Sequence, residues 1–121
     1  MEMYKVYIAG KLNDDAVGYI KNMHQMIYWA NEVRKYGFAV YIPGIDFLAG
    51  LQCGDWEYED YFDNSQPFLE ICDAIFLVPG WETSKGTCRE LELAKSKNIP
   101  IFESEDIDNL WMQFYGEECT L

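Results

Sequence analysis

The sequence predicts a single α/β domain, a three-layer sandwich with helices on both faces of a four- to five-stranded parallel sheet. Two observations predict this class. Short β-branched and aromatic runs alternate with longer segments of helical periodicity, an order typical of parallel sheets. The chain has 121 residues and 50% of them are apolar. That is enough to bury one core, and we expect one domain over residues 1–121.

Four short apolar runs predict the strands: residues 4–9, 38–42, 74–78 and 99–102. The run at 74–78 (AIFLV) is the most apolar, so we expect a central position for it. The segment 45–54 is predicted to be a loop or a broken turn. Pro67 is predicted to divide residues 55–71 into two helical pieces that meet near residues 64–66.

Three further helices are predicted, over residues 16–36, 86–98 and 106–115. Asp14 or Asp15 can cap the first of them, and Gly37 ends it. Apolar residues recur along this helix at the spacing of one helix face: Val17, Ile20, Met23, Ile27 and Ala30.

This order of elements predicts a Rossmann- or flavodoxin-like sheet with strand order 2-1-3-4. Ligands of such sheets bind beyond the carboxyl ends of the strands, where the strand order reverses. The predicted site therefore lies after Ala9 and after Val78.

The charge of the chain restricts its partners. A formal net charge of −12 disfavours nucleic acid polymers and anionic lipid surfaces, so we expect neither as a partner. It leaves open an acidic protein that imitates DNA. Four cysteines without a C-x-x-C pair, together with the single His24, make no standard zinc set, and no metal or cofactor is predicted. Without a signal segment or a long apolar run, the expectation is a cytoplasmic protein.

The segment from Pro79 to Glu90 joins a central strand to a helix. Ser84 or Thr87 can cap that helix, and the free N–H groups at its start can hold a phosphate or a hydroxyl. The spacing is not that of a P-loop. A purely structural strand-to-helix turn remains the alternative.

Two glutamates of that helix differ in their expected surroundings. A helix advances by about 100° per residue, so Glu92 falls on the solvent side, whereas Glu90 falls beside Ala94 at the edge of the buried stripe. A partly desolvated carboxylate there suits nucleophilic or acid–base work, and Tyr7 on the first strand can reach it. The alternatives are a glutamate that complements the helix dipole and a tyrosine that only fills the core.

These residues resemble a known family. The opening Tyr7-Ile8-Ala9-Gly10, the Asp73 before the third strand, and Pro79-Gly80-Trp81-Glu82 with Ser84, Gly86 and Glu90 resemble the nucleoside 2-deoxyribosyltransferase-like superfamily. Within it, the chain is similar to small phage- and bacteria-associated domains of unassigned function.

The resemblance implies a role for several residues. Glu90 matches the nucleophile that attacks C1′ of a deoxyribonucleoside, and Tyr7 matches the tyrosine that holds this carboxylate or the sugar. Ser84 matches a phosphate-binding serine of the members that use 5′-monophosphates, and Gly86 matches the glycine beside it. The remaining substrate-binding candidates of the matched segments are Gly10, Lys11, Gly80, Trp81 and Glu82.

The chain departs from the family pattern at three positions. Ser65 stands where the family has an acid that contacts the base, and Asp63 is the nearest candidate to replace it. Lys11 replaces a proline, and Cys88 replaces a small glycine.

The resulting expectation is a deoxyribosyltransferase or a nucleotide N-glycosidase acting on a small nucleoside or nucleotide. The alternative is a protein, phage-encoded in one version, that binds or sequesters a nucleotide without turnover. The acidic segment 55–63 is predicted to be a solvated helix face, although its aromatic residues could cover a base. A homo-oligomer is expected, with Trp111, Phe114 and Tyr115 as contact residues.

Overall fold

A computed structural model describes residues 3–116. Four parallel strands form one sheet in the order β2-β1-β3-β4, as predicted. The strands are β1 (Lys5–Ala9), β2 (Ala39–Tyr41), β3 (Ala74–Leu77) and β4 (Ile101–Glu103). The two central strands, β1 and β3, are almost entirely buried, in keeping with their apolar sequences.

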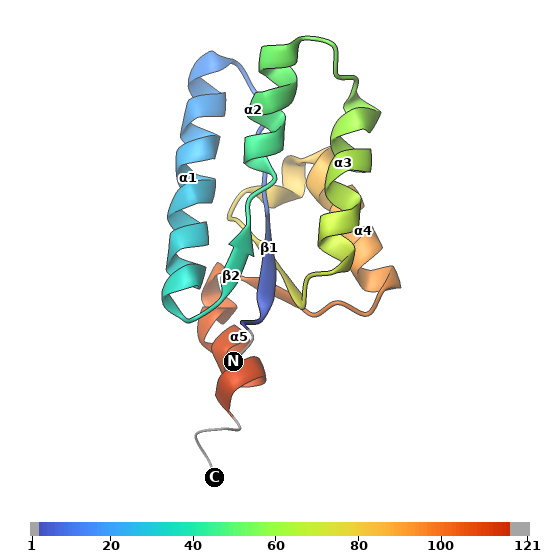
Figure 1. The fold of residues 1–121 in the computed structure, drawn as a ribbon. Coiled ribbons are helices and arrows are strands. Elements are labelled where there is room, and N and C mark those ends of the chain that lie inside the picture. The colour runs from blue at the N-terminus through green and yellow to red at the C-terminus, as the bar shows by residue number, and fades with distance from the viewer. Residues whose placement is uncertain (1–2, 117–121) are drawn as a thin grey trace.

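Five α-helices and two short 3-10 helices connect and cover the strands. The α-helices are α1 (Ala16–Lys35), α2 (Gly44–Cys53), α3 (Tyr58–Glu70), α4 (Lys85–Ser96) and α5 (Ile107–Tyr115). The 3-10 helices are η1 (Trp81–Thr83) and η2 (Ser104–Asp106). Figure 1 shows α1 on one side of the sheet, α3 and α4 on the other, and α2 between α1 and α3.

Two predicted elements were wrong. The expected loop at 45–54 is the helix α2, which ends at Gly54 in the left-handed conformation (φ 80°). The expected break at Pro67 is absent, because α3 continues through it. The proline costs one backbone hydrogen bond, whereas Ser65 and Leu69 on the same helix are buried against the sheet. Packing on both sides of the proline therefore outweighs the local break.

The sheet separates two cores. Side chains on the α1 and α5 side form one apolar cluster that includes Val6, Ile8 and Phe76. The opposite side, under α3 and α4, has a second buried cluster that includes Tyr7, Leu69 and the β3 residues Ile75 and Leu77. Alternation along β1 thus sends Tyr7 to the face that α4 covers.

Helix α1 packs through fewer of its apolar residues than its periodicity suggests. Asp15 caps it by accepting from the N–H of Gly18. The buried residues are Met26, Ala30 and Val33. Of the five predicted members of the apolar face, three are exposed: Val17 at 64%, Ile20 at 66% and Ile27 at 51%.

Helix α5 lies against the amino-terminal end of the sheet. Phe114 packs on Tyr4 (ring centroids 4.8 Å apart), and both Phe114 and Tyr115 pack on Phe38. These rings, expected to mediate oligomer contacts, are therefore engaged within the domain. In the part of the chain that is described, no helix combines the length and apolarity needed to cross a membrane.

Candidate active site

The centre of the candidate site is a hydrogen bond between Tyr7 and Glu90. The Tyr7 hydroxyl donates to Oε2 of Glu90, joining β1 to α4 across 83 residues of sequence. Tyr7 is completely buried, and Glu90 is half-buried. Glu92, two residues further along the same helix, is exposed. The helix phase predicted from the sequence therefore separates the two glutamates correctly.

Burial controls the ionisation of this pair. Desolvation raises the pKa of Glu90 from its ordinary 4.5 to about 7, and the hydrogen bond from Tyr7 opposes this rise. Burial, and then the charge of Glu90, raise the pKa of Tyr7 well above its ordinary value. The phenol is therefore a stable donor, while the carboxyl group changes its charge near neutral pH. Such a titration is characteristic of groups that take part in chemistry.

Ser65 lies beside this pair, at the position where the family pattern has an acid. It is buried on α3, and its hydroxyl donates to the carbonyl oxygen of Phe62 at 3.4 Å. Burial raises the pKa of Tyr7, and the nearby Ser65 hydroxyl opposes part of that rise. Ser65 thus faces the sheet and supports Tyr7. An acid at this position would bring a second negative charge toward Glu90.

A stack of aromatic rings extends the site toward β2. Tyr41 lies between Tyr7, at a centroid distance of 5.5 Å, and Phe68, at 4.7 Å and an interplanar angle of 9°. The hydroxyl of Tyr41 donates to Oδ2 of Asp46 on α2. Burial and this carboxylate raise the pKa of Tyr41. Tyr7 and Tyr41 lie on the neighbouring strands β1 and β2, and each donates a hydrogen bond to one carboxylate on a helix.

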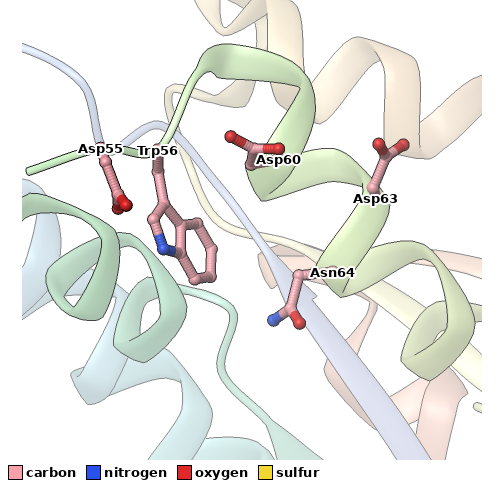
Figure 2. A pocket seen from close by; sticks show the side chains of 5 residues that line it. All are labelled: Asp55, Trp56, Asp60, Asp63 and Asn64. Carbon is pink, nitrogen blue, oxygen red and sulfur yellow. The ribbon is translucent and has the colours of Figure 1, made fainter. Parts of the chain in front are cut away.

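An open pocket of about 490 Å³ lies over the start of α3. It is lined by Asp55, Trp56, Asp60, Asp63 and Asn64. Figure 2 shows that the last three belong to α3 and that Asp55 and Trp56 come from the loop before it. Asp63 is exposed and borders this pocket, whereas Ser65 two residues later points inward. Helix α3 therefore directs Asp63 toward the pocket and the solvent, and Ser65 toward the core.

The loop after β3 forms the start of α4. Ser84 is the N-cap residue, and its Oγ accepts from the backbone N–H of Thr87 at 3.2 Å. Its own O–H is left to donate. A Cβ added at Gly86 would find only the Ser84 hydroxyl, 4.0 Å away, so there is open space beside this glycine. Thr87 is buried, and its hydroxyl has no partner among the described residues.

The other predicted binding residues have structural partners. A Cβ at Gly10 would lie 2.9 Å from Cβ of Val78, so this glycine lets the ends of β1 and β3 approach closely. Gly80 has a positive φ of 92°, which favours glycine. The Trp81 indole donates to Oε1 of Glu103 at 3.0 Å. Lys11 lies 3.9 Å from Asp14.

Four of the predicted residues stand apart from the centre. Glu82 is exposed, and its carbonyl oxygen accepts from the thiol of Cys88. Lys11, Gly80 and Trp81 likewise contact neither Tyr7 nor Glu90 in any hydrogen bond or ion pair that the described residues form.

Arg89 ties the start of α3 to α4, next to Glu90. Its guanidinium makes two hydrogen bonds to the carboxylate of Glu59, at 2.6 and 2.9 Å, and lies 3.8 Å from the ring centroid of Phe62. The segment that lines the pocket is therefore attached to the helix that carries Glu90.

Sequence reasoning missed Tyr41, Phe68, Asp46 and Asn64. The alternation of β2 places Tyr41 on the same side as Tyr7, since the two residues are register partners. That signal was available. The contact of Tyr41 with Asp46 depends on α2, whose helical form was not predicted. Within residues 3–116, no three acidic, cysteine or histidine side chains are placed to hold a metal ion.

Comparison with known families places the chain in one of them. The chain belongs to the family described as a domain of unknown function, DUF4406, whose model matches residues 4–103. No curated protein and no solved structure matches it. The matched range includes every residue of the site described above.

Proposed function

We propose that the protein cleaves or exchanges the N-glycosidic bond of a nucleoside or nucleoside 5′-monophosphate, with Glu90 as the nucleophile. The proposal places the family beside the nucleoside 2-deoxyribosyltransferases. The observation that carries it is the Tyr7–Glu90 pair: a half-buried carboxyl group, held by a buried phenol at the switch point of the sheet, with a pKa near neutrality.

The chemistry follows from that pair. An ionised Oε of Glu90 attacks C1′ as the bond from C1′ to the base nitrogen breaks, and the electron pair of that bond leaves with the base, which takes a proton. Water or a second base then attacks C1′ and releases the Glu90 carboxylate. Tyr7 orients the carboxylate in both steps, and its high pKa keeps it protonated.

Two regions, one at the start of α3 and one at the start of α4, are proposed to take the substrate. Trp56, Asn64 and Asp63 suit a base, because a ring can stack on the indole while the amide and carboxylate bind its N–H groups. Asp63 can fulfil the role of the acid that Ser65 does not supply. The start of α4, with the Ser84 hydroxyl and the open space at Gly86, suits a sugar hydroxyl or a phosphate.

The test is base release from a panel of nucleosides and their 5′-monophosphates, with and without a competing free base, followed by chromatography. We expect release by the wild type and a loss of at least about a thousandfold in Glu90→Ala. Glu92→Ala, which removes an exposed glutamate from the same helix, is the matched control and is expected to keep the wild-type rate. Equal rates for Glu90→Ala and the wild type would contradict the proposal.

A second candidate is a binding protein that holds a nucleotide without turnover. The observation in its favour is Ser65, since a hydroxyl and not a carboxyl group lies beside Tyr7. Saturable binding of a panel member by calorimetry, without released base at long incubation, would select this function over the enzyme.

A further inference from the structure

The outer surface of α1 and α2 carries apolar residues that nothing in the described chain covers. On α1 these are Val17, Ile20, Ile27 and Tyr28, which are 64, 66, 51 and 52% exposed. On α2 they are Ile45, Leu48 and Leu51, which are 63, 45 and 51% exposed. We call this set the α1–α2 face.

The two helices of this face are neighbours. Tyr19 of α1 stacks near Phe47 of α2, with ring centroids 5.4 Å apart, and Gly44 at the start of α2 packs against Met23. Figure 1 shows α2 beside the amino-terminal part of α1. Grouped apolar side chains on adjacent helices mark an interaction surface more strongly than scattered ones.

The charge of the molecule is distributed unevenly around this face. Residues 16–53 contain Lys21, Arg34 and Lys35 against Glu32 and Asp46, a net charge of +1. Residues 54–108 contain 4 basic and 14 acidic residues, a net charge of −10. Two copies of this chain therefore repel each other through most of their surfaces, and the α1–α2 face is the region where they can approach.

Helix α1 is also self-complementary in charge. Asp14 lies ten residues before His24, and Arg34 lies ten residues after it. Asp15 and Lys35 are similarly placed at the two ends, and all four residues are exposed. Their partners within the chain are local: Asp14 is 3.9 Å from Lys11, Asp15 caps α1, Arg34 bonds Asn31, and Lys35 is 2.9 Å from Glu32.

We propose that a second copy of the chain docks on the α1–α2 face, with the two α1 helices antiparallel and crossing near His24. A two-fold contact of this kind pairs each surface with itself, as a cyclic dimer requires. It sets Asp14 and Asp15 of one copy against Arg34 and Lys35 of the other. The exposed isoleucines lie between these charged ends and lose their contact with water. This proposal is independent of the catalytic one.

The first test is the mass of the protein by sedimentation equilibrium, on wild type and on two matched variants. The wild type is expected to be a dimer. Ile20→Asp is expected to raise the dimer dissociation constant roughly thirtyfold or more, as for a buried interface residue. Ile71→Asp makes the same change at a residue that is 63% exposed on another surface, and should leave the dimer intact. A monomeric wild type, or equal effects of both changes, would overturn the proposal.

The second test addresses the antiparallel arrangement. Asp14→Arg alone and Arg34→Glu alone each place like charges at both ends of the contact, so each variant is expected to dimerise more weakly. Mixed together, they restore opposite charges at both ends, and the mixture should form a heterodimer. A mixture no tighter than its components would overturn this arrangement. Binding of a monomeric wild type to anionic vesicles would assign the face to a membrane instead.

Discussion

The two sides of the sheet use the same strands for different purposes. The side under α1 and α5 is a continuous apolar cluster around Val6, Ile8 and Phe76. The side under α3 and α4 contains polar groups that a stability-driven core would avoid: the Tyr7 phenol, the Glu90 carboxyl, and a Thr87 hydroxyl without a partner in the described chain. Both sides contain a buried apolar cluster, and the side under α3 and α4 adds polar groups whose ionisation is shifted by burial.

The largest stability effect is expected on the apolar side. Phe76 is completely buried in the middle of β3, and Phe76→Ala is expected to lower the free energy of unfolding by about 3–5 kcal/mol through lost burial and a cavity. Phe68→Ala, at a phenylalanine that is 43% exposed, should cost only about 1 kcal/mol, chiefly its stacking on Tyr41. Urea denaturation of both variants measures the difference. Similar losses at the two positions would contradict the difference in burial between Phe76 and Phe68.

In contrast to Phe76→Ala, Glu90→Gln is expected to raise the free energy of unfolding at neutral to alkaline pH. Because the pKa of Glu90 is raised from 4.5 to about 7 on folding, its stabilising contribution is complete below about pH 4.5 and is lost as the pH rises to about 7. Above that pH, the folded chain carries a desolvated carboxylate. The glutamine removes this cost but can still accept from Tyr7. We therefore expect the variant to be more stable than wild type by about 1–3 kcal/mol near pH 8.

The pH dependence of the Glu90→Gln difference is its control. Thermal unfolding at several pH values should show the advantage of the variant shrinking to near zero at about pH 4.5. A variant less stable than wild type at about pH 8 would mean that the carboxylate is stabilised, and not strained, by its surroundings.

The smallest expected effect is that of Tyr7→Phe on the pKa of Glu90. The hydroxyl of Tyr7 lowers the pKa of Glu90, so its removal should raise that pKa further. If Glu90 is the nucleophile, the acidic limb of kcat/KM for base release moves to higher pH by the same amount. Tyr36→Phe, which removes an exposed hydroxyl bonded to Asp108, is the control and should leave the profile unchanged. An unchanged pH profile of kcat/KM in Tyr7→Phe would show that the Tyr7 hydroxyl does not influence the pKa of Glu90.

The sequence was most informative where a local pattern and the sheet topology agreed. The period of β1 and the phase of α4 together brought Tyr7 and Glu90 to one side of the sheet, and the structure joins them. The alternation of elements predicted the parallel sheet, and the expected strand order 2-1-3-4 was confirmed.

The remaining features depend on packing that no local pattern reveals. Pro67 predicted a break, but the buried residues on both sides of it keep α3 continuous. The Tyr41–Asp46 contact needed a helix that was expected to be a loop. On α1, the periodicity identified apolar residues but not whether the rest of the chain covers them, and three of the five are exposed.

The central claim is that folding tunes the carboxyl group of Glu90, and a direct titration tests it. The protein would be labelled with ¹³C at the glutamate side chains, and Glu90→Gln would identify the signal. The account predicts a midpoint at about pH 7 for that carboxyl. A midpoint at the ordinary glutamate value of 4.5 would show a solvated side chain and would contradict the account.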